Sequence, residues 1–497
     1  MPPVTKLLIA NRGEIAVRII RTCRAMGVGT VAVYSEADAD APHTRLADTA
    51  VAVHGAPGRV DYLDVPALLA AARATGADAI HPGYGFLSEN AAFARAVLDA
   101  GLTFIGPSPD AIAAMGDKVA ARARMQTAGV PLVPASGVLA AEPLVFTEAA
   151  ATIGYPVVVK AAAGGGGKGM RIVHDAAHLP DAMRAATREA TAAFADGRLY
   201  LERYLQRPRH VEVQVFGDAH GRIVDLGERE CSIQRRHQKI VEETPSPAVS
   251  PELRAAMAEA AVRAARAVGY VGAGTVEFLL DETGRFYFLE MNTRLQVEHP
   301  ITEWITGIDL VREQILVARG EPLSFTTVTP RGHALECRLY SEDPAHGFLP
   351  ATGTVRALGI PSGPGVRFDG GIATGTVIGV EYDPMLAKIS TWGTTREEAR
   401  GRMLVALRDT VVLGVTTNRD YLRAVLEHPA FVAGETHTQF LAEHLEGWRP
   451  ARRAGRDLAA VAAALALMAP ASGDGPALAA EPSPFATLAG WRAGASS

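Results

Sequence analysis

Cysteine is scarce in this chain of 497 residues, and its scarcity excludes two ways of organising a fold. The three cysteines, Cys23, Cys231 and Cys337, are far apart in sequence and do not have the spacing of metal ligands. We therefore expect neither a disulfide framework nor a cysteine-based zinc site. So few cysteines fit a protein of the reducing cytoplasm, which is the location we predict.

Long apolar runs and an excess of basic charge are also missing. The longest apolar stretch, 458–470, is too short and too rich in alanine to span a bilayer. The formal net charge is -5 and the pI is near 6.3, whereas nucleic-acid-binding proteins are usually basic. A strand expected at 7–10 leaves no room ahead of it for a targeting peptide. We expect no membrane and no nucleic-acid partner.

The first third of the chain lacks the glycine motif of dinucleotide-binding proteins. Residues 1–113 alternate strand and helix patterns, with strands expected at 6–10 and 29–34, which predicts a parallel sheet of Rossmann type. No Gly-x-Gly-x-x-Gly follows the first strand, which argues against a dinucleotide. The loop 81–88 follows a strand end, where such sheets bind ligands, but its composition fits a plain turn equally well.

A second glycine run, 164–169, lies between strands expected at 156–160 and 172–173. It is not a Walker loop, because its lysine is not followed by Ser or Thr and no helix begins after it. A strand, a glycine turn and a strand form a hairpin whose bare amides can close over phosphate oxygens. Lys118 and Lys160 add positive charge suited to a triphosphate. The alternative is a flexible linker.

One predicted hairpin carries a carboxylate on each strand. The apolar runs 276–280 and 286–289 flank a turn that contains Gly284. If the turn has an even number of residues, Glu277 and Glu290 lie directly opposite each other, with Cβ atoms about 5 Å apart. Two such charges need a cation between them, and Mg²⁺ takes carboxylate oxygens. The alternative is a pair of solvated glutamates on an exposed face.

Polar residues continue beyond this hairpin at intervals of two: Asn292, Arg294, Gln296 and Glu298. A fully extended chain from Glu290 to Glu298 would be roughly 26 Å long, which exceeds one reaction centre, so we expect a bend after Asn292. The segment would then join the metal site to a second site that holds Arg294 and Glu298. Carboxylate, amide and guanidinium groups gathered in this way are typical of a reaction site.

Three further segments carry polar residues within strand patterns. The strand expected at 199–204 places Glu202 beside an apolar crease of the kind that binds adenine and ribose. The strand at 210–216 puts His210, Glu212 and Gln214 on one face. The cluster 231–239 mixes polar and apolar residues, which favours an anion-binding rim over a solvated basic loop. Its polar members include Gln234, His237, Gln238 and Lys239.

Seven motifs then follow one another in a familiar order between Ala10 and about Glu443. They are Asn11–Ala16, His81–Asn90, Gly164–Met170, Arg209–Glu212, Gln234–Lys239, Glu290–His299 and Glu336–Arg338. In this series the chain resembles biotin carboxylase, the ATP-grasp component of biotin-dependent carboxylases.

The resemblance implies an α/β and α+β architecture in several parts. It places a Rossmann-like domain at 1–113, an ATP-grasp domain at 114–330 and a mixed α/β C-terminal domain at 331–445. Residues 446–497 form a tail, with a helix expected at 457–468 and a linker after it, that leads toward a docking and biotinyl region absent from the sequence.

The resemblance also implies the reaction and its nucleotide site. ATP would phosphorylate bicarbonate to carboxyphosphate, which carboxylates N1′ of biotin in the first half-reaction of an acyl-CoA carboxylase of acetyl, propionyl or methylcrotonyl type. Glu277 and Glu290, with Asn292 beside them, would bind Mg²⁺ or Mn²⁺. The ATP-binding set would comprise Lys118, Lys160, Gly165, Gly166, Gly167, Glu202, Leu205, His210, Gln234 and His237.

By the same resemblance, bicarbonate and biotin would meet at Lys239, Arg294, Gln296, Val297, Glu298 and Arg338. Glu298 would be the general base that takes the proton of bicarbonate. Arg338 would stabilise the enolate-like biotin, whose negative charge needs a fixed guanidinium. Lys239 and Arg294 complete the predicted catalytic set.

No Ala-Met-Lys-Met biotin-attachment motif occurs in the sequence. Biotin would arrive on a carrier protein, or the chain is a shortened α subunit; the sequence leaves both open. A carboxyltransferase subunit and a homodimer or larger complex are further expected partners. Two other functions compete: a carbamoyl-phosphate or aminoimidazole type of ATP-grasp ligase, against which Glu298 and Arg338 argue, and a silent assembly subunit. The silent subunit would have lost one of Lys239, Arg294, Glu298 or Arg338, yet all are present.

Overall fold

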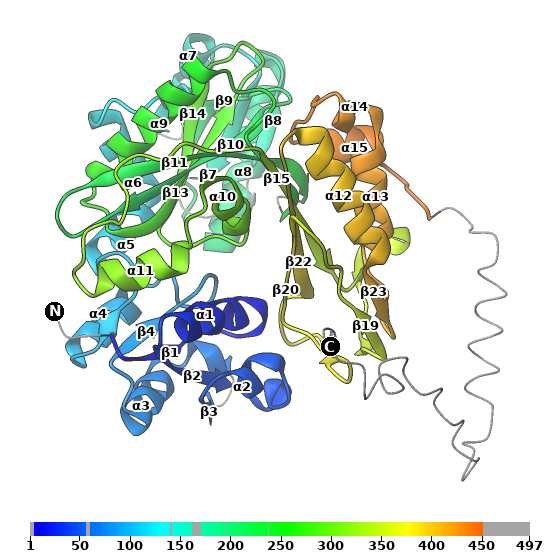
Figure 1. Ribbon diagram of the computed structural model, residues 1–497. Coiled ribbons are helices and arrows are strands. Elements are labelled where there is room, and N and C mark those ends of the chain that lie inside the picture. The colour runs from blue at the N-terminus through cyan, green and yellow to red at the C-terminus, as the bar shows by residue number, and fades with distance from the viewer. Residues whose placement is uncertain are drawn as a thin grey trace, which may run out of the picture. The chain divides into compact units, whose positions relative to one another are not determined.

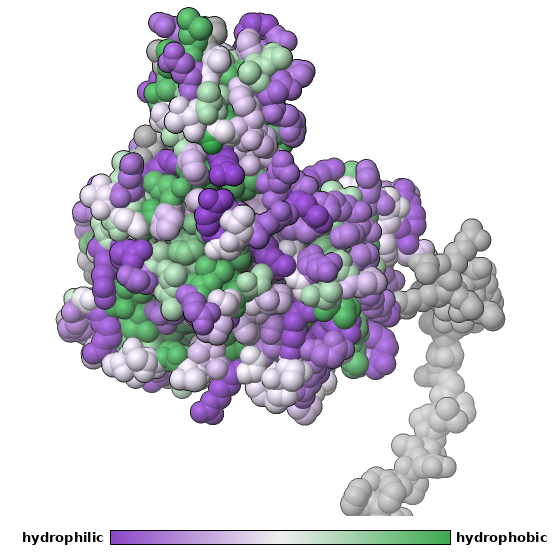
Figure 2. Space-filling view, turned by 90° about the horizontal axis from the view of Figure 1, so that it is seen from above, coloured by the Kyte–Doolittle hydropathy of each residue, from purple (hydrophilic) through white to green (hydrophobic). Residues whose placement is uncertain are grey.

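The computed structural model describes residues 4–55, 60–139, 142–161, 170–194, 196–236 and 238–450. Residues Met1–Trp448 form one unit, and a second unit begins at Arg449. The helix and linker predicted at 457–484 lie outside the described residues. Within the described ranges, no helix combines the length and the apolar character needed to cross a membrane. Figure 2 shows hydrophilic residues over much of one face, interrupted by smaller hydrophobic areas.

The N-terminal part is a parallel five-stranded sheet in the order β3-β2-β1-β4-β5, as the alternating pattern predicts. Its strands are β1 (Lys6–Ile9), β2 (Gly29–Tyr34), β3 (Thr49–Ala52), β4 (Ala79–His81) and β5 (Thr103–Phe104). The helices are α1 (Gly13–Ala25), α2 (Pro42–Leu46), α3 (Val65–Thr75), α4 (Ala91–Asp99) and α5 (Pro109–Gly116). Helix α1 buries Ile15, Ile19 and Cys23, which are four residues apart, so one face packs on the sheet. Strand β3 was not predicted.

A smaller antiparallel sheet, in the order β6-β9-β7-β8, follows in the chain. It consists of β6 (Ala135–Leu139), β7 (Val157–Ala161), β8 (Arg171–Val173) and β9 (Leu199–Arg203), with helices α6 (Lys118–Thr127), α7 (Pro143–Ile153) and α8 (Leu179–Phe194) in the same region. Phe146 of α7 packs with Val157 and Leu201 in one apolar cluster. The predicted hairpin of β7 and β8 is confirmed. Its glycine turn, with Gly165, Gly166 and Gly167, lies outside the described residues.

The largest sheet has eight antiparallel strands in the order β14-β13-β10-β11-β12-β15-β22-β20. The strands are β10 (Arg209–Gly217), β11 (Ile223–Arg235), β12 (Gln238–Thr244), β13 (Gly272–Leu280), β14 (Phe286–Asn292), β15 (His333–Tyr340), β20 (Val366–Gly370) and β22 (Met385–Gly393). Because β12 pairs with β15, the sheet continues without a break across the domain boundary predicted at residue 330. Figure 1 shows α12 and α13 beside the strands β15 and β22, which α12 contacts.

The remaining elements complete the part of the chain that the structure describes. The helices are α9 (Pro251–Arg266), α10 (His299–Thr306), α11 (Leu310–Ala318), α12 (Arg396–Asp409), α13 (Arg419–Glu427), α14 (Pro429–Val432) and α15 (Phe440–His444). Short strand pairs are β16 (Glu342–Asp343) with β17 (Leu349–Pro350), β18 (Gly353–Thr354) with β21 (Val377–Ile378), and β19 (Ala357–Gly359) with β23 (Val411–Leu413).

Candidate active site

The carboxylate hairpin is formed by β13 and β14, and Glu277 lies directly opposite Glu290, as predicted. The assumption behind that prediction was wrong in one respect. Leu280 pairs with Phe286, which leaves an odd turn of residues 281–285. A bulge next to Glu277 shifts the register by one residue, and this shift brings the two glutamates back into opposition.

The predicted bend after Asn292 is also confirmed. Strand β14 ends at that residue, and Glu298 stands at the N-terminal boundary of α10. Between them, Arg294 donates hydrogen bonds to Glu89 (2.9 Å) and to Asn292 Oδ1 (2.8 Å). Glu89, which lies within the His81–Asn90 motif, was not predicted as a site residue. The segment therefore connects the hairpin carboxylates to a second group of charges.

Glu277 is buried and surrounded by nitrogen donors. Its Oε1 accepts hydrogen bonds from Lys239, Asn292 and Gln296, each 2.9 Å long. Its Oε2 lies 2.9 Å from His210 Nε2. Burial alone would raise the pKa of Glu277, but Lys239 and His210 outweigh burial and hold the pKa below its ordinary range. Glu277 is therefore an ionised carboxylate.

Lys239 is the centre of the charge network. Its Nζ donates to Glu212 (2.6 Å), Glu277 (2.9 Å) and Glu298 (2.7 Å), so all three ammonium protons are used. Burial would lower the pKa of Lys239, but the three carboxylates outweigh burial and raise it well above the usual value. Lys239 stays charged, and its hydrogen bonds connect β12 to β10, to β13 and to the turn before α10.

Arg229, which the sequence reasoning missed, underlies this network. Its side chain is fully buried on β11, and its five N–H groups all have acceptors. The acceptors are Glu212 (2.6 Å), Gln214 (2.7 Å), Thr302 (2.9 Å), Thr275 (3.2 Å) and Gln296 (2.6 Å). No local pattern marked Arg229, because β11 carries several other charged residues, among them Asp225, Glu228 and Glu230. Arg229 fixes the side chains of Glu212 and Gln296, which in turn face Lys239 and Glu277.

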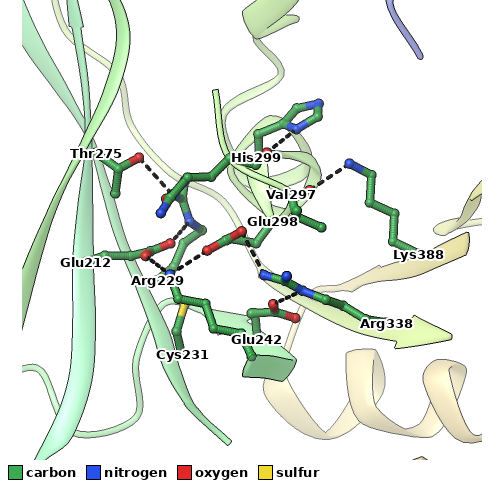
Figure 3. A network of polar contacts seen from close by, with 12 residues as sticks. Glu212, Arg229, Cys231, Glu242, Thr275, Val297, Glu298, His299, Arg338 and Lys388 are labelled. Carbon is green, nitrogen blue, oxygen red and sulfur yellow. Dashed lines mark hydrogen bonds and ion pairs between the residues drawn. The ribbon is translucent and has the colours of Figure 1, made fainter. Parts of the chain in front are cut away.

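Glu298 lies between two cations, Lys239 and Arg338, and Figure 3 shows its contact with Arg338. Lys239 bonds its Oε1 at 2.7 Å, and Arg338 Nη2 bonds its Oε2 at 3.0 Å. Arg338 Nε also donates to Glu242 at 2.6 Å. Burial would raise the pKa of Glu298, but Lys239 and Arg338 hold it well below the ordinary value. The structure thus brings together the predicted base and the predicted guanidinium.

Two more buried carboxyl groups stand behind Arg338. Glu242 on β12 and Glu336 on β15 are cross-strand partners, so they share one face of the sheet. Burial raises the pKa of Glu242 to about 7, and burial also raises the pKa of Glu336 well above its usual value. Neither oxygen of Glu336 has a hydrogen-bond partner within the described residues. This pair therefore holds a proton near neutral pH, which limits the negative charge next to Arg338.

A cavity of about 370 Å³ adjoins the hairpin. Lys160 and Glu202, which form an ion pair, line one side, and Glu290 and Asn292 line the other. Apolar side chains complete the wall, among them Ile112, Met115, Met170, Leu279 and Phe288. An apolar crease with a few polar anchors suits a nucleoside with its phosphates.

Several other predicted ATP-binding residues do not line this cavity. His210 and Gln234 contact each other (2.6 Å) beside Glu277 and do not line this cavity. Leu205 is half-buried and is not part of the lining either. Lys118 begins α6, and His237 lies outside the described residues. Val297 contributes a backbone carbonyl that accepts a hydrogen bond from Lys388 (2.7 Å).

Comparisons with known proteins follow this order of parts. Family models match at residues 3–112 (biotin carboxylase, N-terminal domain), 117–326 (carbamoyl-phosphate synthase L chain, ATP binding domain) and 336–443 (biotin carboxylase C-terminal domain). The chain is 50% identical over 440 residues to a biotin carboxylase of Nostoc sp., which covers 88% of this chain and 98% of that protein.

Two further relatives connect the chain to larger carboxylases. The mitochondrial methylcrotonoyl-CoA carboxylase subunit alpha of Mus musculus is 48% identical over 444 residues, which are 89% of this chain and 62% of that protein. The biotin carboxylase domain dimer of Hydrogenobacter thermophilus 2-oxoglutarate carboxylase, solved with MgADP, ADP and bicarbonate, matches with a TM-score of 0.84 and 43% identity. That match covers 91% of this chain and 100% of the solved one.

Proposed function

This chain belongs to the biotin carboxylase family, and we propose that its buried charge network deprotonates bicarbonate and holds biotin for carboxylation. It is an ATP-dependent ligase that uses Mg²⁺ and carboxylates biotin in the first half-reaction of a biotin-dependent carboxylase. The observation that carries the proposal is Glu298, held between Lys239 and Arg338 at the end of the hairpin segment.

The hairpin residues fit a divalent cation. Glu277 and Glu290 lie opposite each other, Asn292 is adjacent, and all three supply the oxygen atoms that Mg²⁺ prefers. Glu277 is ionised, and Glu290 is exposed at the cavity. We therefore propose these three residues as the metal ligands. The bound ion would neutralise charge on the ATP phosphates.

ATP itself is proposed to occupy the cavity between the small sheet and the hairpin. Lys160 faces that space from β7, and the apolar wall suits the adenine ring. His210 and Gln234 would act through their contacts beside Glu277. The roles of Lys118, Leu205, His237 and the glycines 165–167 rest on the family resemblance alone.

The proton transfer follows from the charges around Glu298. In the free enzyme its two cations make it a weak base, because they stabilise the ionised form. Bicarbonate that binds to Lys239, Arg294, Gln296 and the Val297 backbone would bring negative charge close to Glu298 and take hydrogen bonds from Lys239. Both changes raise the pKa of Glu298 toward the working range, so that it can accept the bicarbonate proton.

Arg338 would then act on biotin. Removal of the N1′ proton leaves negative charge on the ureido oxygen, and a guanidinium fixed by two charged hydrogen bonds stabilises such charge without reorganising. Lys239, Glu298 and Arg338 thus divide the reaction between bicarbonate and biotin.

The competing functions have less support. The ATP-binding match alone would also suit a carbamoyl-phosphate type of ligase, but the flanking matches are to biotin carboxylase domains. A silent assembly subunit is disfavoured because the charged groups are present and in mutual contact.

We further propose the partners and the setting. Biotin would reach the site on a biotinyl carrier, which is either a separate protein or a further part of a longer α subunit; the given sequence has no Ala-Met-Lys-Met motif. A carboxyltransferase subunit of acyl-CoA type would use the carboxybiotin, and two copies would form a dimer in the cytoplasm. The domain division at residues 113, 330 and 445 is proposed as predicted.

A bicarbonate-dependent ATPase assay with free biotin tests the function. ADP release should require bicarbonate, and labelled carboxybiotin should form from labelled bicarbonate. Glu298→Gln is the matched control, because it keeps the side-chain shape and removes the base. ATP cleavage that depended on ammonia or on an aminoimidazole substrate, and not on bicarbonate, would overturn the proposal.

A further inference from the structure

Lys388 is a fully buried lysine next to Arg338. It lies on β22, directly opposite Arg338 on β15, so both side chains leave the same face of the sheet. Its exposed fraction is 1%. Lysine is seldom buried to this extent unless it has partners, because desolvating an ammonium group is expensive. The contacts of Lys388 therefore require an explanation.

The ammonium group of Lys388 contacts three segments that are distant in sequence. It donates a hydrogen bond to the backbone carbonyl of Val297 (2.7 Å), as Figure 3 shows. It also lies 3.4 Å from Glu14 on α1, and 5.6 Å from the ring centre of Tyr84 in the loop after β4. Its hydrogen bond reaches the turn that leads into α10, and Glu298 is the next residue in that turn.

Two adjacent strands thus hold Glu298 at two points. Arg338 on β15 bonds its carboxylate, and Lys388 on β22 bonds the carbonyl of the preceding residue. A carboxylate that is also a base needs its backbone fixed, since the bonds from Lys239 and Arg338 hold only the end of the side chain. We propose that Lys388 is a positioning residue that sets the place of Glu298 relative to bicarbonate.

This inference rests on the proposed role of Glu298. It assigns Lys388 an indirect role, through the Val297 carbonyl, and no contact with substrate. A lysine that only supported the fold would affect stability and all kinetic constants together. A positioning residue should affect the bicarbonate step selectively. Displacing a catalytic group by about 1 Å can lower a rate by about a hundredfold.

The test compares Lys388→Met with Ser390→Ala. Methionine keeps the length of the side chain and removes its donor. Ser390 lies two residues further along the same face of β22 and also bonds α10, through Trp304 Nε1 (3.0 Å), but away from the Glu298 turn. It is therefore a matched control for the general packing of β22 on α10.

Lys388→Met should lower kcat/KM for bicarbonate by tenfold to a hundredfold, an order-of-magnitude expectation, and leave the KM for ATP within about twofold. Ser390→Ala should stay near wild type in both. If Lys388→Met leaves kcat/KM for bicarbonate unchanged, or if Ser390→Ala loses as much, the inference is wrong.

A second variant protects against failure to fold. Lys388→Met leaves Glu14 without its cation, so the double variant Glu14→Gln/Lys388→Met removes both charges and should show the same selective loss. Glu298→Gln distinguishes a failure of the proposed function from a failure of the inference about Lys388. If Glu298→Gln keeps bicarbonate-dependent ATP cleavage, the proposed function fails; if it loses that activity while Lys388→Met keeps it, only the inference about Lys388 fails.

Discussion

Arg338→Gln should reduce stability in a way that depends on pH. The substitution takes a guanidinium from two buried carboxylates, which it bonds at 2.6 Å (Glu242) and 3.0 Å (Glu298). Removal of one partner from a buried ion pair typically costs about 3–5 kcal/mol. Glu298 keeps its bond to Lys239 and stays ionised. Glu242 loses the charged hydrogen bond to its Oε1, and its Oε2 already has no hydrogen-bond partner within the described residues.

The pH dependence follows from the pKa of Glu242, which burial has already raised to about 7. A raised folded-state pKa gives stability that is present below the unfolded value and lost as pH rises through the folded one. In the wild type this loss of stability levels off above pH 7, because Glu242 is then fully ionised. Without Arg338 the pKa of Glu242 rises further, so the variant continues to lose stability up to a higher pH. Denaturant unfolding at pH 6 and pH 8.5 should show the deficit growing with pH.

The activity of the same variant distinguishes the roles of two residues. Loss of Arg338 removes charge stabilisation formed mainly in the transition state, typically ~3 kcal/mol or about a hundredfold in biotin carboxylation. Bicarbonate-dependent ATP cleavage should survive in Arg338→Gln and disappear in Glu298→Gln, because carboxyphosphate forms only from deprotonated bicarbonate. ADP release and labelled carboxybiotin are measured side by side. Equal loss of both activities in both variants would refute the assigned roles.

Three further predictions concern single side chains. Glu290→Gln should raise the Mg²⁺ concentration needed for ATP use and leave the melting temperature unchanged, because Glu290 is exposed; an unaltered Mg²⁺ titration would count against the paired site. Burial raises the pKa of Glu14 to about 7, so its stability contribution is present below pH 4.5 and is lost as pH rises through 7. Glu14→Gln should therefore reduce the stability difference between pH 5 and pH 8 by about 3 kcal/mol, and an unfolding difference as large as that of the wild type would contradict this. Arg229→Met should lower the free energy of unfolding by about 3–5 kcal/mol, since Glu212 and Gln296 lose a fully buried donor. Thermal unfolding measures this loss, and a melting temperature equal to that of the wild type would contradict the prediction.

Local patterns in the sequence predicted much of the fold. The apolar face of α1 and the alternation of strands and helices need only neighbouring residues, and both are confirmed. The opposition of Glu277 and Glu290 was also predictable, although a bulge had to offset the odd turn. Strand β3 was missed because it has only four residues, Thr49–Ala52, and these are half-buried or exposed.

The rest of the candidate site depends on register between distant strands. Arg229 takes its acceptors from β10, β13 and α10 and the turn before it, and no short pattern indicates such partners. Glu242 faces Glu336, and Lys388 faces Arg338, only because β12, β15 and β22 pair in one particular alignment. A slip of one residue would turn these side chains to the opposite face. Sequence alone could not supply that alignment.

The continuous eight-stranded sheet limits how this enzyme can be divided. A cut at residue 330 would separate β12 from β15 and leave each with an unpaired row of backbone N–H and C=O groups. Exposed strand edges of this kind pair with other chains and cause aggregation. The same cut would part Lys239 from Arg338, which hold Glu298 from opposite sides. Exchange of C-terminal parts between related carboxylases should therefore keep β12, β15 and β22 together, as one inherited block.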